Sequence, residues 1–290
     1  MSNLKLFNQT ITATNTQEYL SQVLGEKKAS FVSNLASLVS NNQSLQECEP
    51  LTILYAGLKA TALDLPLDSN LGFAYVIPFK DNKQNRVVAQ FQIGYRGFLQ
   101  LAQRSGQFET INVRDVREGE IISEDFVSGS MIFEKLKVSR ETAKVIGYVA
   151  YFKLINGFQK TSYWTVEELE LHGKKYSQTF KKGFGLWKDN FNAMGKKTAL
   201  KLLLATYAPL SVEMQRAIKS DQSVIKSEKE EEIEYVDNES ETEISHEDLE
   251  TLYEMKAEAL SEQQRTDIER ILNNKEANSY KKIHNLLINT

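Results

Sequence analysis

Two neighbouring strand-like segments joined by Asn-Gly constrain the fold more than any other feature of this sequence. Residues 144–155 and 158–164 are rich in β-branched and aromatic side chains, a composition typical of strands. Asn156-Gly157 lies between them and indicates a hairpin, because both residue types tolerate the positive φ of a tight turn. Residues 110–116 and 131–138 have a similar composition. The middle of the chain is therefore predicted to be antiparallel β-structure.

Helical patterns are found on both sides of this β-rich region. Residues 17–41 carry apolar side chains on one helical face, which predicts one or two helices. Pro50 suits the first turn of a helix over residues 51–63. The other expected elements are a hairpin over 73–79 and 86–93, helices over 95–105, 186–207 and 212–219, a short helix capped by Thr165 and Glu168, and a loop over 173–185. The predicted fold class is α+β.

Charge is distributed unevenly along the chain. From Asp221 onward there are 8 lysines and arginines against 19 acids, a net charge of −11, whereas residues 1–220 carry 27 against 20, a net charge of +7. A basic body joined to an acidic tail favours a polyanionic partner. A tail that merely aids solubility explains the same asymmetry, and the asymmetry alone leaves both explanations open.

The acidic part of the chain suggests a division into three regions. Residues 226–243 are poor in large apolar side chains and read as a flexible linker. Beyond them, apolar residues recur at helical spacing over 246–260, 261–273 and 277–288. The predicted organisation is a core over 1–220, an acidic linker over 221–245, and a small helical module over 246–290.

Residues 172–201, the lysine–aromatic segment, carry the most informative chemistry. They contain eight lysines, five aromatic residues and a single acid, Asp189. Lysines neutralise phosphates, and aromatic faces stack on unpaired bases, so the segment predicts a single-stranded nucleic-acid ligand. The candidate contacts are Lys174, Lys175, Lys181 and Lys182 in the expected loop, with Lys188, Lys196, Lys197 and Lys201 on the expected long helix. Lys197 and Lys201 are four residues apart and share one flank.

Simpler explanations stand beside several of these candidates. A solvated lysine face accounts for many lysine clusters, although so low a density of acids favours binding. Phe191 and Met194 are predicted to be core residues, and Trp187 is equally suited to the core or to stacking on a base.

A second basic set comprises Arg96, Arg104, Arg114 and Arg117. Packing explains these arginines as well as binding does. Gly94 and Gly97 flank Tyr95-Arg96 and permit close backbone approach, either to a ligand or to a neighbouring strand.

The sequence gives little sign of a secreted, membrane-bound or disulfide-linked protein. Cys48 is the only cysteine and cannot form an internal disulfide, so a reducing cytoplasm is expected. The polar N-terminal region lacks the apolar run of a signal peptide, and no apolar run approaches the roughly 20 residues of a membrane span.

Signals for an enzyme are weak. Gly195-Lys196-Lys197-Thr198 is similar to the end of a phosphate-binding loop, but Asn190 stands where that loop needs its first glycine. Three histidines and one cysteine give no zinc spacing. Asp64 and Asp68 are better explained as turn residues than as a metal pair. No cofactor and no covalent catalytic step are predicted.

Several motifs, taken in order, closely resemble the RecT family of phage recombinases. They are Leu63-Asp64-Leu65-Pro66, residues 71–79, residues 93–97 with 101–106, and Val116-Arg117-Glu118-Gly119, followed by Trp187, Met194, Lys196-Lys197-Thr198, Lys201, Pro209 and Gln215-Arg216-Ala217. The resemblance covers roughly residues 50–218. Gly195 departs from it, since the family often has alanine there and glycine weakens a helix slightly.

This resemblance implies a single-strand annealing protein that works without ATP, forms oligomers on DNA and partners a phage exonuclease. The core over 1–220 would then carry DNA binding, annealing and oligomerisation, and the module over 246–290 would dock a partner. It also implies a core similar to that of Rad52-type annealing proteins, with antiparallel strands packed on a long helix. Lys196, Lys197 and Lys201 match basic positions of the family motif, so a DNA-binding role carries over to them. Arg96, Arg104 and Arg117 match as well.

The sequence therefore predicts a non-enzymatic protein that binds single-stranded DNA, anneals complementary strands in recombination and holds the annealed duplex. It is expected in the cytoplasm of a bacterial host, on DNA, with the C-terminal module docking an exonuclease or the host single-strand binding protein. A passive protector of single strands is the first alternative, and a nuclease is the second.

Overall fold

The computed structural model describes residues 3–68, 70–81, 84–125, 127–137, 139–181, 183, 185–225, 233–234 and 262–273, together with positions 249, 250, 253, 256, 260, 280, 283 and 287. The chain divides into two compact units, Met1–Glu239 and Ser240–Thr290. None of the helices in these described ranges is long and apolar enough to cross a membrane.

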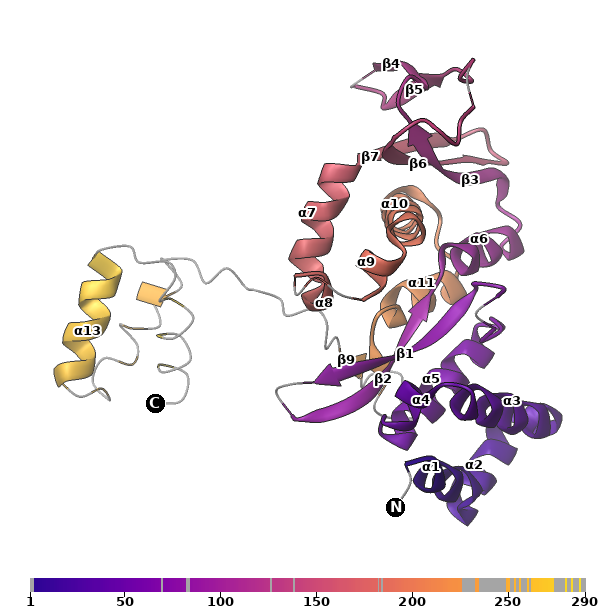
Figure 1. Ribbon diagram of the computed structural model, residues 1–290, viewed down its shortest axis with the longest axis vertical. Coiled ribbons are helices and arrows are strands. Elements are labelled where there is room, and N and C mark those ends of the chain that lie inside the picture. The colour runs from indigo at the N-terminus through magenta and orange to yellow at the C-terminus, as the bar shows by residue number, and fades with distance from the viewer. Residues whose placement is uncertain are drawn as a thin grey trace. The chain divides into compact units, whose positions relative to one another are not determined.

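The chain begins with helices that form one end of the first unit (Figure 1). They are α1 (Asn3–Thr12), α2 (Thr14–Leu24), the 3-10 turn η1 (Gly25–Lys27), α3 (Lys28–Ser40), α4 (Gln43–Gln46) and α5 (Pro50–Ala62). The helices expected over residues 17–41 are confirmed, and Phe31 and Leu35 are buried as their spacing predicts. Helix α1 was not predicted, because its polar composition hides the buried pair Phe7 and Ile11.

A β-hairpin follows these helices and is tied to α5. Strands β1 (Ala74–Asp81) and β2 (Arg86–Ile93) pair antiparallel, as predicted. The Thr52 hydroxyl accepts a hydrogen bond from the Ala89 backbone N–H at 2.9 Å, which fixes α5 against β2. Helix α6 (Tyr95–Arg104) starts directly after β2, so the hairpin sets the position of the first turn of α6.

The main sheet has three antiparallel strands in the order β3-β6-β7. These are β3 (Phe108–Arg117), β6 (Val145–Leu154) and β7 (Gln159–Thr165). Gly157 has a φ of 89° in the turn between β6 and β7, which confirms the hairpin expected there. Helix α7 (Val166–Tyr176) begins with both hydrogen bonds of the capping box predicted from Thr165 and Glu168.

The segment between β3 and β6 differs from its prediction. It contains a small separate hairpin of β4 (Ile121–Asp125) and β5 (Ser130–Phe133), where the sequence predicts one strand over 131–138. Strand β4 was not predicted because three of its five residues, Ser123, Glu124 and Asp125, are polar.

The predicted continuous helix over residues 186–207 is wrong. Helix α9 (Leu186–Asp189) ends at Asn190, and α10 (Phe191–Tyr207) begins after it. The Asn190 side chain accepts a hydrogen bond from the Ala193 N–H at 3.2 Å and so caps α10, an alternative to continuing the helix that asparagine favours. The preceding segment, predicted as a loop, contains the end of α7 and the short helix α8 (Gln178–Lys181).

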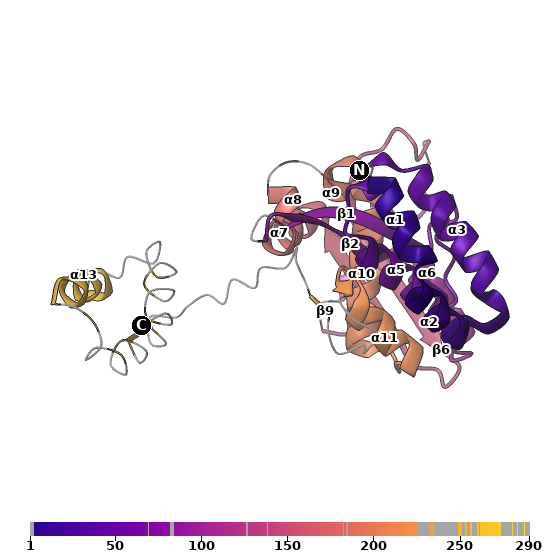
Figure 2. The same ribbon diagram turned by 90° about the horizontal axis from the view of Figure 1, so that it is seen from below.

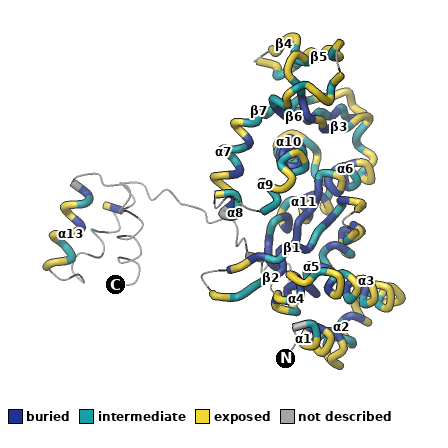
Figure 3. The backbone as a smooth tube through the Cα atoms, viewed as in Figure 1, coloured by how far each residue is buried: buried dark blue, intermediate teal, exposed yellow. Residues whose placement is uncertain are grey.

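Helix α10 is the centre of the first unit. It packs against the main sheet and against α6, and the views in Figures 1 and 2 agree on this central place. Leu200 and Leu204 are fully buried on it, and the other buried positions concentrate in α5, the first hairpin and α6 (Figure 3). The predicted α+β class, with antiparallel strands packed on a helix, is confirmed.

The departure at Gly195 has a packing reason. A Cβ added at Gly195 would lie 2.7 Å from a ring carbon of Tyr148, which stands on β6. Glycine therefore lets α10 approach the sheet closely at this point.

Packed structure continues beyond residue 220, where the sequence places the end of the core. Helix α11 (Val212–Ser220) is followed by Asp221, which is 1% exposed, and by the buried residues Ser223 and Val224. The Ser223 carbonyl accepts a hydrogen bond from the Phe91 N–H at 2.8 Å, so the chain pairs with the outer edge of β2. Strand β8 (Val224–Ile225) then pairs with β9 (Ile233–Glu234), so the packed core extends beyond α11.

The second unit contains α13 (Glu262–Asn273), which confirms the middle one of its three predicted helices. A separate apolar cluster comprises Leu249, Leu260, Ile268, Leu272, Tyr280, Ile283 and Leu287. Most residues of the helices predicted over 246–260 and 277–288 lie outside the described residues.

Candidate nucleic-acid interface

A cavity of about 380 Å³ opens between the first hairpin, the start of α6 and the start of α10. We call it the α6–α10 cavity. Its lining includes two tyrosines, three cations and several amides, among them Tyr75, Gln92, Tyr95, Arg96, Asn190, Lys196 and Lys197.

Two glycines build one wall of this cavity by close backbone packing. A Cβ at Gly94 would lie 2.2 Å from the Gly72 carbonyl oxygen, and one at Gly97 would lie 2.2 Å from that of Phe73. The Gly94 N–H also donates to the Phe73 carbonyl at 2.9 Å. Of the two explanations that the sequence left open, these glycines serve approach to a neighbouring backbone, which fixes the first turn of α6 at the cavity.

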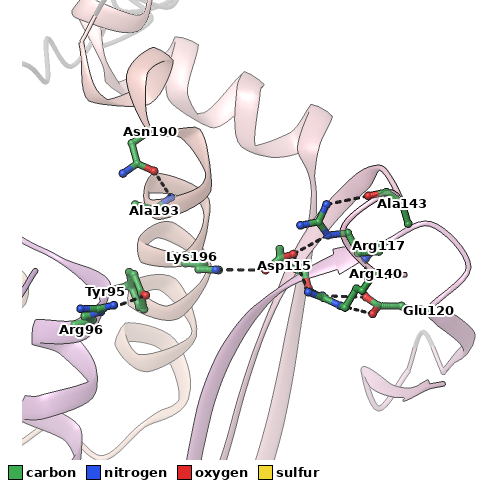
Figure 4. Close-up of polar contacts among 10 residues, drawn as sticks. All are labelled: Tyr95, Arg96, Asp115, Arg117, Glu120, Arg140, Ala143, Asn190, Ala193 and Lys196. Carbon is green, nitrogen blue, oxygen red and sulfur yellow. Dashed lines mark hydrogen bonds and ion pairs between the residues drawn. The ribbon is translucent and has the colours of Figure 1, made fainter. Parts of the chain in front are cut away.

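Lys196 projects from α10 into a cluster of charges at the cavity (Figure 4). Its Nζ lies 3.3 Å from Asp115 Oδ1 on β3 and 5.9 Å from the ring centre of Tyr95. Arg117 and Arg140 contact the same Asp115 carboxylate at 2.9 and 3.2 Å. Burial raises the pKa of Asp115, but its own backbone N–H, Lys196 and Arg140 outweigh burial and hold that pKa below its ordinary value. The carboxylate is therefore ionised at neutral pH, and three cations surround it.

Two of the three candidate arginines hold backbone loops. Arg117 Nη1 donates to the Ala143 carbonyl at 2.8 Å, in addition to its contact with Asp115. Arg104 Nη2 donates to the Leu63 carbonyl at 2.6 Å. Packing therefore accounts for Arg104 and Arg117 in this structure.

Arg96 is the candidate arginine that lies at the cavity. It is exposed, and it donates to the Leu71 carbonyl at 3.2 Å and to the Tyr95 hydroxyl at 3.4 Å. Its guanidinium carbon lies 6.0 Å from the ring centre of Tyr95, and the Lys196 ammonium lies 5.9 Å from it, so both cations stand beside this ring at the cavity.

Lys197 and Lys201 share a flank of α10, as their spacing predicts, but both bind a buried carboxylate. Lys197 Nζ lies 2.8 Å from Asp221 Oδ1, and Lys201 Nζ lies 2.7 Å from Oδ2 of the same carboxylate. The Ile93 N–H donates to Asp221 as well, at 2.8 Å. The side chain of Lys197 is only 5% exposed. We therefore infer a structural role for this pair in place of the phosphate contacts that the sequence predicts.

The pKa shifts of this buried cluster follow from its geometry. Burial opposes ionisation of Asp221, but Lys197, Lys201 and the Ile93 N–H outweigh it and lower the pKa of that carboxyl. Burial also lowers the pKa of Lys197, and Asp221 counteracts part of that effect. The cluster holds an ionised carboxylate at the point where α11 ends.

The remaining candidate lysines lie outside the cavity. Lys174, Lys175, Lys181 and Lys188 are exposed on α7, α8 and α9. Lys174 makes a loose contact with Glu170 at 3.8 Å, and Lys175 lies 5.6 Å from the Tyr176 ring centre. Lys182 lies outside the described residues. Helix α9 leads into the cavity through Asn190, so Lys188 is the one of these four lysines nearest in sequence to the cavity lining.

The aromatic residues of the lysine–aromatic segment form a cluster inside the unit. Trp187 is 5% exposed, and its ring centre lies 5.6 Å from that of Phe180 and 5.7 Å from that of Phe191. Of the two roles open to Trp187, the structure supports the core. The tyrosines at the cavity, Tyr75 and Tyr95, were not predicted as base-stacking residues. The Gly-Tyr-Arg-Gly run at 94–97 was the available signal.

The described part of the chain contains no group of three or more histidine, cysteine, aspartate or glutamate side chains that could hold a metal ion. Asp64 accepts a hydrogen bond from Arg104, and Asp68 accepts one from the Asn70 N–H at 2.8 Å, so both act in the loop. Cys48 is buried, and burial, followed by Glu47 and Glu49, raises the pKa of its thiol to about 12.

Comparison with known proteins identifies the family. The sequence profile of the RecT family matches residues 29–237, so the chain belongs to the RecT family. Uncharacterized protein YqaK of Bacillus subtilis is 43% identical over 202 residues, which cover 68% of this chain and 65% of that protein. Protein RecT of Escherichia coli is 33% identical over 181 residues, which cover 62% of this chain and 65% of that protein. The matched region thus spans just under two thirds of each relative.

Proposed function

We propose that the protein binds single-stranded DNA and anneals complementary strands in phage-type homologous recombination, without ATP. Membership of the RecT family supports this function, and the profile match from residue 29 to residue 237 contains every residue that lines the α6–α10 cavity. The observation that carries the proposal is the convergence of Lys196 and Arg96 beside the Tyr95 ring at that cavity. Cations beside an aromatic face suit a single strand, whose phosphates and bases are both accessible.

The mechanism that we propose is physical. Lys196, Arg96 and the exposed lysines of α7–α9 hold one strand by its phosphates, and a second strand is tested by base pairing. Correct pairing supplies the driving energy, since base stacking contributes about 1.4 kcal/mol per step. The protein lowers the kinetic barrier by neutralising phosphate charge, which reduces repulsion between the two strands.

Independence from ATP is consistent with the surroundings of the Gly195-Lys196-Lys197-Thr198 run. This run lies inside helix α10, where Gly195 packs on Tyr148 and Lys197 is buried against Asp221. A phosphate-binding loop needs free backbone N–H groups and an accessible lysine. Neither requirement fits these residues, so we propose an annealing protein rather than a nucleotide-driven motor.

The packing of the β3-β6-β7 sheet on α10 supports a core related to that of Rad52-type annealing proteins. In the same proposal, the protein forms oligomers on DNA in the cytoplasm of a bacterial host and also holds the annealed duplex. The unit Ser240–Thr290, with its own apolar cluster, would dock a phage exonuclease or the host single-strand binding protein.

An annealing assay without nucleotide tests the function. Two complementary oligonucleotides that carry a fluorophore and a quencher are mixed with and without the full chain. We expect the protein to accelerate quenching. A passive protector would bind the strands but slow quenching, and a nuclease would shorten end-labelled DNA in the presence of magnesium.

A further inference from the structure

We propose that the α6–α10 cavity holds one nucleobase of the bound strand, taken out of the stack, while the neighbouring phosphate lies at the rim. This inference rests on the proposed binding of single-stranded DNA and names the part of the strand that the cavity takes. The volume of the α6–α10 cavity, about 380 Å³, lies near the lower end of the range for small-molecule sites, which suits a single nucleotide.

The first argument is an oriented hydrogen-bond acceptor in the cavity wall. Gln90 Nε2 donates to the Gln222 carbonyl at 2.9 Å, so the orientation of the Gln90 amide is fixed by the backbone. Gln92 Nε2 then donates to Gln90 Oε1 at 2.7 Å. This chain of bonds leaves Gln92 Oε1 as an acceptor in a residue that lines the cavity and is 7% exposed.

This acceptor discriminates between parts of a nucleotide. No donor to Gln92 Oε1 is found among the residues that the structure describes. Because Gln92 lines the cavity, a ligand that supplies a donor can bond to this acceptor. Every base carries an N–H donor on its pairing edge, whereas a phosphate diester carries none. Gln92 therefore favours a base at this depth of the cavity.

The second argument is the aromatic lining. Tyr75 and Tyr95 are half-buried at the cavity, and the Tyr75 hydroxyl packs against Gly72, 3.1 Å from where a Cβ would stand. Aromatic faces stack on any base, which suits a protein that acts on strands of every sequence.

The third argument is the charge at the rim. Lys196 and Arg96 stand beside Tyr95, and the backbone N–H groups of Tyr95 and Arg96 open helix α6, where the helix dipole favours an anion. The phosphate and the base are the two ends of one nucleotide. The cations at the rim suit the phosphate, and Gln92 in the cavity wall suits the base.

The decisive experiment uses the unmodified full chain and two oligonucleotides of equal length. One carries all its bases, and the other has abasic sites with an intact backbone. Binding is followed by fluorescence anisotropy over a range of salt concentrations. We expect the abasic oligonucleotide to bind between about fivefold and a hundredfold more weakly, because base–aromatic contacts are lost, with the same salt slope, because phosphate contacts remain.

A pair of variants assigns this difference to the cavity. Gln92→Met removes the acceptor with little change in size and should reduce the preference for the complete oligonucleotide, whereas Tyr75→Phe keeps the aromatic face and should preserve it. If Gln92→Met fails to fold, the comparison on the unmodified chain still decides. Equal affinity of the chain for both oligonucleotides would overturn the base site and leave the proposed function standing. Failure to bind either one would overturn the proposed function itself.

Discussion

The two flanks of helix α10 place neighbouring lysines in opposite environments. Lys196 is 18% exposed and meets Asp115 at the α6–α10 cavity, whereas Lys197, the next residue, is 5% exposed and bonded to the buried Asp221. Successive residues of a helix point about 100° apart, so one step along the chain moves a lysine from the solvent edge into the core. A run of basic residues in a family motif therefore need not consist of ligand contacts alone.

The two carboxylates that these lysines bind, Asp115 and Asp221, also differ in how strongly the fold depends on them. Asp115 is shared by three cations at a partly open site, so removal of one contact leaves others. Asp221 is the carboxylate bound by both Lys197 and Lys201, and it also accepts the Ile93 N–H. We expect losses at Asp221 to act on folding and losses at Lys196 to act on DNA binding.

Truncation gives the largest expected contrast. A chain ending at Ser220 loses Asp221, Ser223 and the strand pairing with β2, so it should be less stable by at least about 3–5 kcal/mol, the cost of breaking a buried ion pair. A chain ending at Glu239 keeps all of these contacts and should unfold like the complete first unit. Chemical unfolding of the two truncated proteins checks this expectation.

The truncation at Glu239 also tests the role of the tail. A docking module predicts normal annealing in vitro, with loss of partner binding and of recombination in cells. A tail that competes for the basic surface predicts tighter DNA binding by the truncated chain at low salt. If the chain ending at Glu239 folds but does not anneal, the tail belongs to the annealing machinery and both ideas are wrong.

The substitution Asp221→Ala probes the buried flank directly. It leaves the Lys197 ammonium without its partner, so the free energy of unfolding should fall by about 3–5 kcal/mol. The matched control is Asp189→Ala, which removes an exposed carboxylate at the end of α9 and should change stability by less than about 0.5 kcal/mol. Equal effects of the two substitutions would contradict the structural role of Asp221.

Acid should erase the difference between the parent chain and Asp221→Asn. The pKa of Asp221 is lowered in the folded state relative to the ordinary value of about 3.9, so its ionisation favours folding above that value. This contribution is lost as the pH falls through the lowered, folded-state pKa. The stability gap between parent and variant should therefore be constant from pH 7 to about 5 and shrink in stronger acid. Urea unfolding at a series of pH values measures it.

Local signals in the sequence predicted most of the elements correctly. Asn156-Gly157 fixed a hairpin, and Thr165 with Glu168 fixed a helix start, because each signal acts through its own backbone neighbours. Family motifs located the region that contains the cavity, and the expected membership of the RecT family is confirmed.

The differences came from contacts between distant residues. Lys197 resembles any surface lysine until Asp221, 24 positions later, is brought against it. Asn190 interrupts a helix that periodicity alone would continue, and Gly195 is explained by the Tyr148 ring on another element. The cavity itself joins residues of β1, β2, α6 and α10, so no single stretch of sequence displays it.

The smallest expected effect on stability belongs to Lys196→Ala, which tests the solvent-facing flank. Removal of one phosphate contact to a single strand should reduce the slope of log affinity against log salt by about 0.7 and weaken binding most at low salt. Stability should change by less than about 1 kcal/mol, because Asp115 keeps Arg117 and Arg140. The matched control is Lys135→Ala, another lysine in the described core, which is exposed after β5 and distant in sequence from the cavity residues. Fluorescence anisotropy at several salt concentrations gives the slope for each variant. A slope that falls equally in both variants would mean that binding follows overall charge, and the contrast between the two flanks of α10 would then have no bearing on DNA recognition.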